Sequence, residues 1–152
     1  MRPVILISAG RRFGQNTRIR QLFENTGVPG YFTITTEIPP ELMDSPPPER
    51  DYYLVFYNEV PREKLRRHNL RCPTILETLW ALGFMNIELA KEIIQKRTRF
   101  MHEPFRAHMC PWRGSEPWRQ ILVRRNERGY AVETVCVKDQ SRETQLVYSL
   151  DV

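Results

Sequence analysis

The sequence predicts a single α/β domain, in which a small, mostly parallel N-terminal sheet with flanking helices is followed by a C-terminal antiparallel β-meander. Its 152 residues are close to the commonest size of one domain. The first thirty-six residues follow a strand–loop–helix–strand pattern, as at the start of a βαβ unit. Three strand-like runs lie close together near the C-terminus. We divide the chain into an α/β part, 1–99, and an aromatic and basic segment with the meander, 100–152.

The N-terminal elements follow from the spacing of apolar residues. Residues 3–9 are a continuous apolar run rich in β-branched side chains, typical of a strand covered on both faces. Apolar residues at helical spacing within 19–23 predict a helix that ends at Gly27. Residues 31–36 predict the second strand.

The loop between the first strand and the helix holds two glycines, and Asn16 or Thr17 is in place to cap the helix. The stretch from Ser8 to Thr17 resembles the strand–loop–Asn-Thr–helix start of flavodoxin-like proteins. The order of the N-terminal elements is also similar to Rossmann-like and receiver-like folds, which implies a parallel sheet and no particular function. No later aromatic, glycine-rich loop is available to sandwich a flavin, so we expect no cofactor.

The remaining segments alternate between helices, strands and one long connection. Residues 37–50 contain five prolines and four acidic residues and predict an extended loop. Residues 52–57 are the most strand-like segment. Proline can open a helix over 61–69 and another from Pro73 to Gly83, with a further helix after Asn86. The C-terminal strands are expected at 120–125, 130–137 and 145–150, the first two joined by a hairpin that ends at Gly129.

Cysteine usage and hydropathy predict a location inside the cell, in the cytoplasm or nucleus. The three cysteines are odd in number and far apart, so they form neither a disulfide framework nor a CxxC motif. The apolar run at the N-terminus is shorter than the ~7–15 residues of a signal-peptide core. No apolar stretch reaches the ~18 residues of a membrane span, so we expect no membrane partner.

Positive charge is gathered in three segments. The chain has a net charge of +5, and residues 1–36, 61–75 and 104–128 each carry +4, whereas residues 37–60 carry −5. Segregated positive charge favours a polyanionic partner. Alternatively, the basic helix faces are solvated or pair with the acidic loop.

The candidate contacts for a nucleic acid or another anion lie in these three segments. The loop before the first helix offers backbone N–H groups and arginines to a phosphate. Residues 62–71 form the densest basic run and include a helical stripe that suits a phosphate backbone. Between residues 106 and 125, arginines alternate with two tryptophans that could stack on unpaired bases, although a buried ring is the alternative for each. The candidate residues are Arg11, Arg12, Arg18, Arg62, Lys64, Arg66, Arg67, Arg71, Trp112, Arg113, Trp118 and Arg119.

Catalytic and metal motifs are not recognisable in the sequence. His102, His108 and Cys110, with Cys72 elsewhere in the chain, are possible zinc ligands, but their spacing matches no structural zinc site. Unrelated surface histidines and buried thiols are the alternative. No Ser-His-Asp or Cys-His arrangement has a familiar context, and the carboxylates gather in the proline-rich loop. We therefore single out no catalytic residue and no metal site, and we prefer a non-enzymatic function, although residues far apart in the sequence can still form a catalytic pair in the folded chain.

Three functions remain, in order of preference. The first is a non-enzymatic module that binds RNA or single-stranded nucleic acid through the basic segments and exposed aromatic rings. The second is a protein-interaction or adaptor subunit that docks an acidic partner within a larger assembly. The third is an enzyme with a phosphate-containing ligand at the loop from Gly10 to Thr17.

Overall fold

The computed structural model describes residues 4–9, 18–24, 32–34, 38–46, 48, 51–57, 69–84, 91–92, 94, 97–107, 117–127, 129–138 and 145–151. Within these ranges nine strands form one sheet. The elements, in chain order, are β1 (Val4–Ala9), α1 (Ile19–Glu24), β2 (Phe32–Ile34), α2 (Pro40–Met43), β3 (Asp51–Tyr57), β4 (Leu70–Arg71), α4 (Ile75–Phe84), β5 (Arg97–Phe100), β6 (Phe105–Arg106), β7 (Trp118–Asn126), β8 (Gly129–Cys136) and β9 (Gln145–Asp151).

The sheet is mixed and mostly antiparallel, so the predicted fold class is wrong. Its strand order is β1-β3-β9-β5-β7-β8-β2, with β4 beside β9 and β6 beside β7. Among the described pairs, β5 with β9 and β2 with β8 are parallel, and the others are antiparallel. The chain is therefore not a helix-flanked, mostly parallel sheet of the Rossmann-like or flavodoxin-like kind.

The error at the N-terminus lies in the strand partners and not in the elements. Strands β1 and β2 and helix α1 form where the sequence predicts them. However, β1 pairs antiparallel with β3, from Val4 opposite Phe56 to Ala9 opposite Asp51, and β2 lies at the far end of the sheet beside β8. Periodicity identifies a strand, but its neighbour depends on which distant strand offers a matching apolar surface.

The predicted C-terminal meander is half present. Strands β7 and β8 form the expected hairpin, which closes where Asn126 pairs with Gly129. Gly129 has a positive φ of 147°, a conformation that costs other residues more than glycine. Strand β9 does not continue this hairpin but lies between β3 and β5, and so joins the two halves of the sheet.

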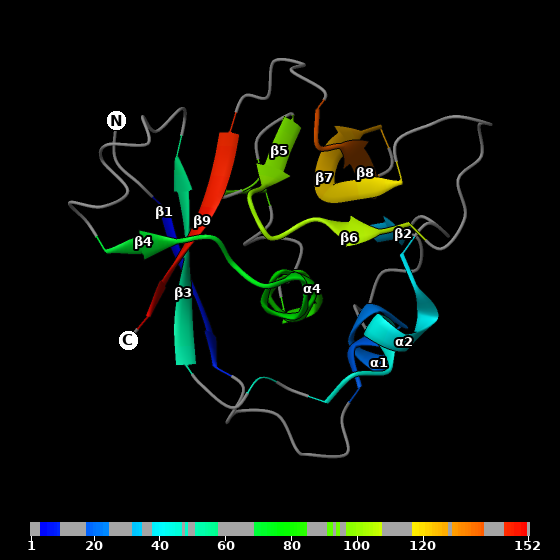
Figure 1. The fold of residues 1–152 in the computed structure, drawn as a ribbon, viewed down its shortest axis with the longest axis horizontal. Helices are drawn as coiled ribbons and strands as arrows, with labels where there is room; N and C mark the ends of the chain where they lie inside the picture. Colours follow the sequence, from blue (N-terminus) through cyan, green and yellow to red (C-terminus); the bar gives the residue numbers. More distant parts are fainter. Residues whose placement is uncertain are drawn as a thin grey trace.

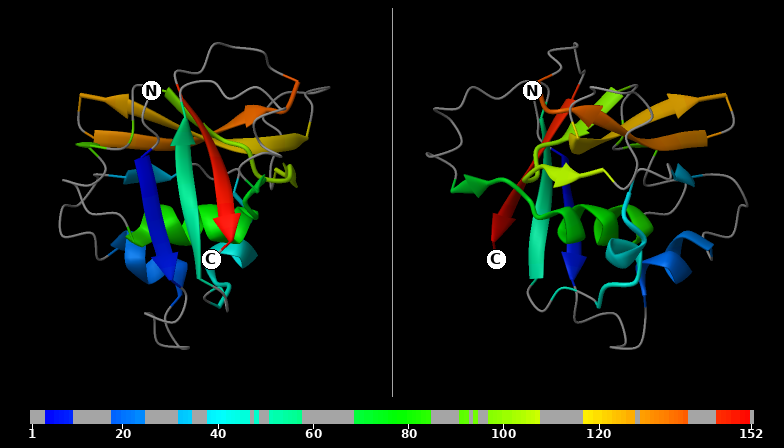
Figure 2. Two further views of the ribbon diagram at one scale, coloured as in Figure 1. Left: turned by 90° about the vertical axis from the view of Figure 1, so that its left-hand side faces the viewer. Right: turned by 45° about the vertical axis from the view of Figure 1, so that its right-hand side comes forward.

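Helix α4 lies on the concave side of this sheet. Figure 1 shows it end-on, with β1, β3 and β9 on one side, β5 to β8 above and α1 and α2 on the other side. In Figure 2 (left), β1, β3 and β9 run across the direction of β7 and β8, so the sheet is strongly twisted. Trp80 of α4 is fully buried in the core, and the rings of Phe56 and Phe100 meet edge to face at 6.0 Å.

The start of α4 at Ile75 is two residues after the predicted start at Pro73 and is fixed by a capping box. The Glu77 amide donates to Thr74 Oγ1 at 3.1 Å, and the Thr74 amide donates to Glu77 Oε1 at 2.8 Å. Arg71 forms a bidentate ion pair with the same carboxylate, at 2.7 and 2.6 Å. The Tyr52 hydroxyl donates to the Glu77 carbonyl at 2.7 Å, which attaches the helix to β3.

The acidic, proline-rich connection is not wholly an extended loop, which corrects that prediction. Pro40 occupies the first turn of α2, where its missing N–H costs no hydrogen bond. Ile38 and Met43 are buried in the core, and Asp44 forms an ion pair with Arg20 of α1 at 3.1 Å. The helix predicted over 61–69 falls almost entirely outside the described residues, as does most of the one predicted after Asn86.

Candidate nucleic-acid interface

A groove opens between the residues that precede β6, the first residue of β7 and the residues that follow β8. It is a cavity of about 530 Å³ lined by Glu103, Pro104, Trp118, Val137 and Lys138. Trp118 is 49% exposed and is the exposed large hydrophobic side chain of the described residues. A well-packed domain usually keeps a ring of this size mostly covered, so its position beside a cavity marks a candidate binding surface.

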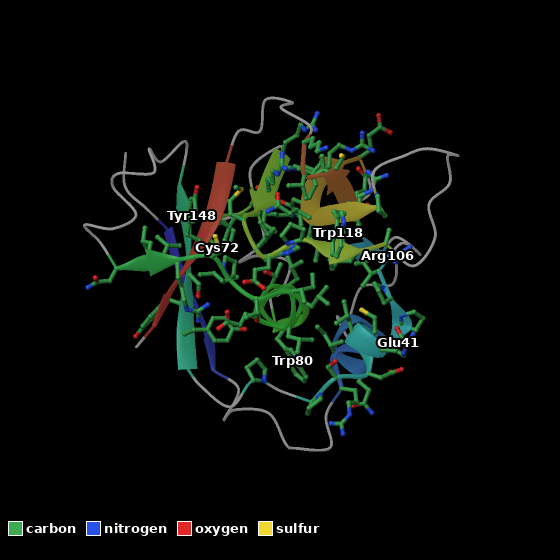
Figure 3. The ribbon with its side chains drawn as sticks, in the orientation of Figure 1. Glu41, Cys72, Trp80, Arg106, Trp118 and Tyr148 are labelled. Carbon is green, nitrogen blue, oxygen red and sulfur yellow. The ribbon has the colours of Figure 1, made fainter. Side chains whose placement is uncertain are left out.

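Strand register places a cation directly beside the Trp118 ring. Arg106 of β6 is the antiparallel partner of Trp118, and both side chains are exposed (Figure 3). On the other side of Trp118, the Val137 amide donates to the Trp118 carbonyl at 3.3 Å and extends the β7–β8 ladder. Directly opposed residues leave the same face of a sheet about 5 Å apart. Arg106, Trp118 and Val137 therefore form one row across three strands.

The buried His102 fixes the part of the groove that contains Glu103 and Pro104. Its Nε2 accepts a hydrogen bond from the Ile121 amide at 2.9 Å, and its Nδ1 lies 2.6 Å from the Glu103 carbonyl. Because Nε2 accepts, Nδ1 carries the proton and donates to that carbonyl. The ring thus satisfies a backbone amide of β7 in the gap between β5 and β6, where neither strand pairs with β7.

Two further buried side chains connect this segment to the other walls of the groove. Gln120 Nε2 donates to the His102 carbonyl at 2.8 Å, and Arg99 Nε donates to Gln120 Oε1 at 2.9 Å. Arg99 Nη2 also donates to the Val137 carbonyl at 3.0 Å. Arg99 is only 6% exposed. The network of Arg99, His102 and Gln120 therefore holds all three chain segments that line the cavity.

The same network requires a neutral histidine. Burial is the largest influence and lowers the pKa of His102 to about 4, with a smaller contribution from the positive charge of Arg99. The hydrogen bond to the Glu103 carbonyl acts in the opposite direction. A protonated Nε2 could not accept from Ile121, so His102 serves here as a structural group. The expectation of a surface histidine is wrong for this residue.

Four of the residues predicted to bind an anion are described, and they do not meet at one place. Arg18 lies at the start of α1, and Figure 2 shows α1 at the opposite end of the molecule from β7 and β8. Arg71 lies on β4, also apart from β7, and its guanidinium is engaged by Glu77. Trp118 alone of the four lines the groove.

Arg119 follows Trp118 in sequence but leaves the opposite face of β7. It pairs with Phe105, which belongs to the buried core, and successive side chains of a strand alternate between faces. Its Nε is buried without a hydrogen-bond partner among the described residues. The remaining predicted contacts lie outside the described residues, namely Arg11, Arg12, Arg62, Lys64, Arg66, Arg67, Trp112 and Arg113.

Sequence reasoning did not select the other residues at the groove. Arg106 belongs to the alternation of arginine and tryptophan but has no feature that distinguishes it from its neighbours. Glu103 and Lys138 are thirty-five positions apart and carry no motif. They meet because β6 and β8 both pair with β7, which is a property of the sheet and not of local sequence.

Of the possible zinc ligands, His102 and Cys72 are described, whereas His108 and Cys110 lie outside the described residues. No group of three or more potential metal ligands is present in the described ranges. Cys72 is an exposed residue, so the expectation of a buried thiol is wrong for it. Partial burial of the sulfur still raises the pKa of the thiol, the negative charge of Glu103 adds to this, and Arg71 opposes it. The thiol therefore stays protonated near neutral pH and is a weak nucleophile.

Comparison with family models, with curated proteins and with solved structures finds no match to this chain. No described helix is long and apolar enough to cross a membrane.

Proposed function

We propose that the chain binds single-stranded nucleic acid at the groove formed by β6, β7 and β8. The observation that supports this most strongly is the half-exposed Trp118 ring with Arg106 as its cross-strand partner and Lys138 in the cavity wall. An exposed ring stacks on an unpaired base, and adjacent cations contact the phosphates that flank the base. Single strands suit a groove of this size better than a duplex, whose bases are already stacked.

Rigidity of the groove also supports the proposal. The buried network of Arg99, His102 and Gln120 fixes the three segments that line it, so little conformational entropy is lost on binding. Arg106 and Trp118, which are proposed to contact the ligand, lie on strands β6 and β7 and not on long loops.

The direct test is binding of a labelled oligouridylate of about nine nucleotides, within the ~4–16 nucleotides that single-strand binders cover. We expect Trp118→Ala to weaken binding by about 5- to 150-fold, because stacking contributes ~1–3 kcal/mol per base. We expect Arg106→Glu to weaken binding. The slope of the logarithm of the binding constant against the logarithm of salt concentration should become less negative by about 0.7, because one phosphate contact is lost.

The matched control is Arg125→Glu. Arg125 is an exposed arginine like Arg106, but it lies on β7 seven residues from Trp118, roughly 23 Å along an extended strand. This separation exceeds the ~8 Å screening length of physiological salt, so the control should retain most of the binding. Equal losses in the Arg106 and Arg125 variants would indicate general attraction to positive charge and count against this groove.

Docking of an acidic protein segment is the second candidate, because tryptophan and arginine are also the commonest anchors of protein interfaces. It is favoured over nucleic acid if labelled oligonucleotides fail to bind at low salt while an acidic peptide changes the fluorescence of Trp118.

A further inference from the structure

The cavity lining contains one negatively charged hydrogen-bond acceptor, and its other residues are apolar or basic. Glu103 lines it together with Trp118, Pro104, Val137 and Lys138. For a surface that attracts phosphate alone, a carboxylate is unfavourable because it repels the anion. Its presence beside a stacking ring therefore points to a ligand group that donates hydrogen bonds.

The position of Glu103 is fixed by its backbone and leaves its side chain exposed. His102 Nδ1 donates to the Glu103 carbonyl at 2.6 Å, and His102 itself is held by Ile121 and Gln120 of β7. The next residue, Pro104, has a restricted backbone. The Glu103 side chain is exposed and its residue is held in place, as a specificity-determining group requires.

An ionised carboxylate is an acceptor with two oxygens, and it distinguishes among stacked bases by their Watson–Crick edges. Guanine presents two adjacent donors there, N1–H and the N2 amino group. Adenine and cytosine each present one donor beside an acceptor, and uracil presents one donor between two acceptors. Only guanine therefore matches both oxygens of a carboxylate.

We infer that the groove selects guanine, with the base stacked on Trp118 and its Watson–Crick edge donating to the carboxylate of Glu103. Arg106 and Lys138 contact the flanking phosphates. This inference rests on the proposed function and adds a base preference to it. Charge-assisted bidentate contacts of this type are among the stronger ones in proteins, and we expect a preference of about tenfold over adenine.

The test compares oligouridylates that differ at one central position, so that length and charge are constant. We expect a central guanosine to increase affinity by about tenfold over a central adenosine, which stacks but lacks the paired donors. A central inosine keeps N1–H and lacks the N2 amino group, so its affinity should lie between the two. The preference for guanosine should be lost in Glu103→Gln, while affinity for uniform oligouridylate stays the same or rises.

The matched control is Glu127→Gln, which removes the same charge from an exposed position in the β7–β8 turn. It should keep the guanosine preference, and thermal unfolding of both variants should match that of the parent chain. If guanosine and adenosine bind equally in a Trp118-dependent manner, the inference is overturned and the proposed function stands. If the preference for guanosine over adenosine persists in Glu103→Gln, Glu103 does not cause that preference. If none of the oligonucleotides binds, both proposals fail.

Discussion

The start of α4 and the groove at β6–β8 both carry charged side chains, and these side chains have different roles at the two places. At α4, Arg71 and Glu77 satisfy each other at 2.6 and 2.7 Å, and Glu77 also caps the helix. At the groove, Arg106, Glu103 and Lys138 are exposed around an aromatic ring. Removing charge at the first place should therefore lower stability, whereas removing it at the second should change binding.

The largest effect is expected for Glu77→Ala. This change removes the capping box and leaves the half-buried Arg71 guanidinium without its carboxylate. Breaking such a pair from one side costs about 3–4 kcal/mol of unfolding free energy. Urea denaturation measures it, and Thr74→Ala, which removes only the cap, should cost about 1 kcal/mol. Equal values for the two variants would show that Arg71 contributes little.

Acidification is expected to have the next largest effect, through His102. Its pKa is about 4 in the folded chain and 6.5 ordinarily, so the native state prefers the neutral ring. The contribution of the neutral His102 to the free energy of unfolding is complete above pH 6.5 and is lost as the pH falls toward 4. At ~1.4 kcal/mol per pH unit, the loss is about 3 kcal/mol.

His102→Gln isolates this contribution, because the carboxylates of both chains titrate alike. The variant should be less stable at pH 7, and its stability should fall less between pH 6.5 and pH 4. Parallel pH profiles of unfolding free energy for the two chains would contradict a neutral, buried His102.

Trp118→Ala is expected to separate binding from stability. About half of the residue is exposed and only the covered half is lost from packing, so the unfolding free energy should fall by about 1–1.5 kcal/mol. A larger loss of stability, with oligonucleotide affinity unchanged, would assign Trp118 to the fold and remove the distinction between the two regions.

The smallest effect is expected for Arg124→Ala. Its ion pair with Glu133 is short, at 2.8 Å, but its side chain is 53% exposed, compared with 34% for Arg71. Solvent screening limits such pairs to about 0.2–1 kcal/mol. A cost as large as that of Glu77→Ala would mean that pairing distance, and not burial, sets the contribution of charge in this chain.

Strands β1, β2, β3, β7, β8 and β9 and helices α1 and α4 were predictable because their signals are local, whereas the short strands β4, β5 and β6 were not predicted. The apolar run of β1, the helical spacing of α1 and α4 and the glycine of the β7–β8 hairpin each act within a few residues. Helix α2 was missed because its four residues lie among prolines, and Thr74 with Glu77 was a capping-box signal that reading the helix from Pro73 overlooked.

The sequence by itself indicated the longer strands and helices, but not α2, β4, β5 or β6, and it placed a tryptophan among arginines. Tertiary structure alone decided that β1 pairs with β3, that β9 enters the middle of the sheet and that Trp118 and Arg119 leave opposite faces. It also brought Glu103, Trp118 and Lys138 to one cavity. The reason is that propensity and periodicity are properties of neighbouring residues, whereas strand partners are chosen among distant segments by the packing of the whole chain.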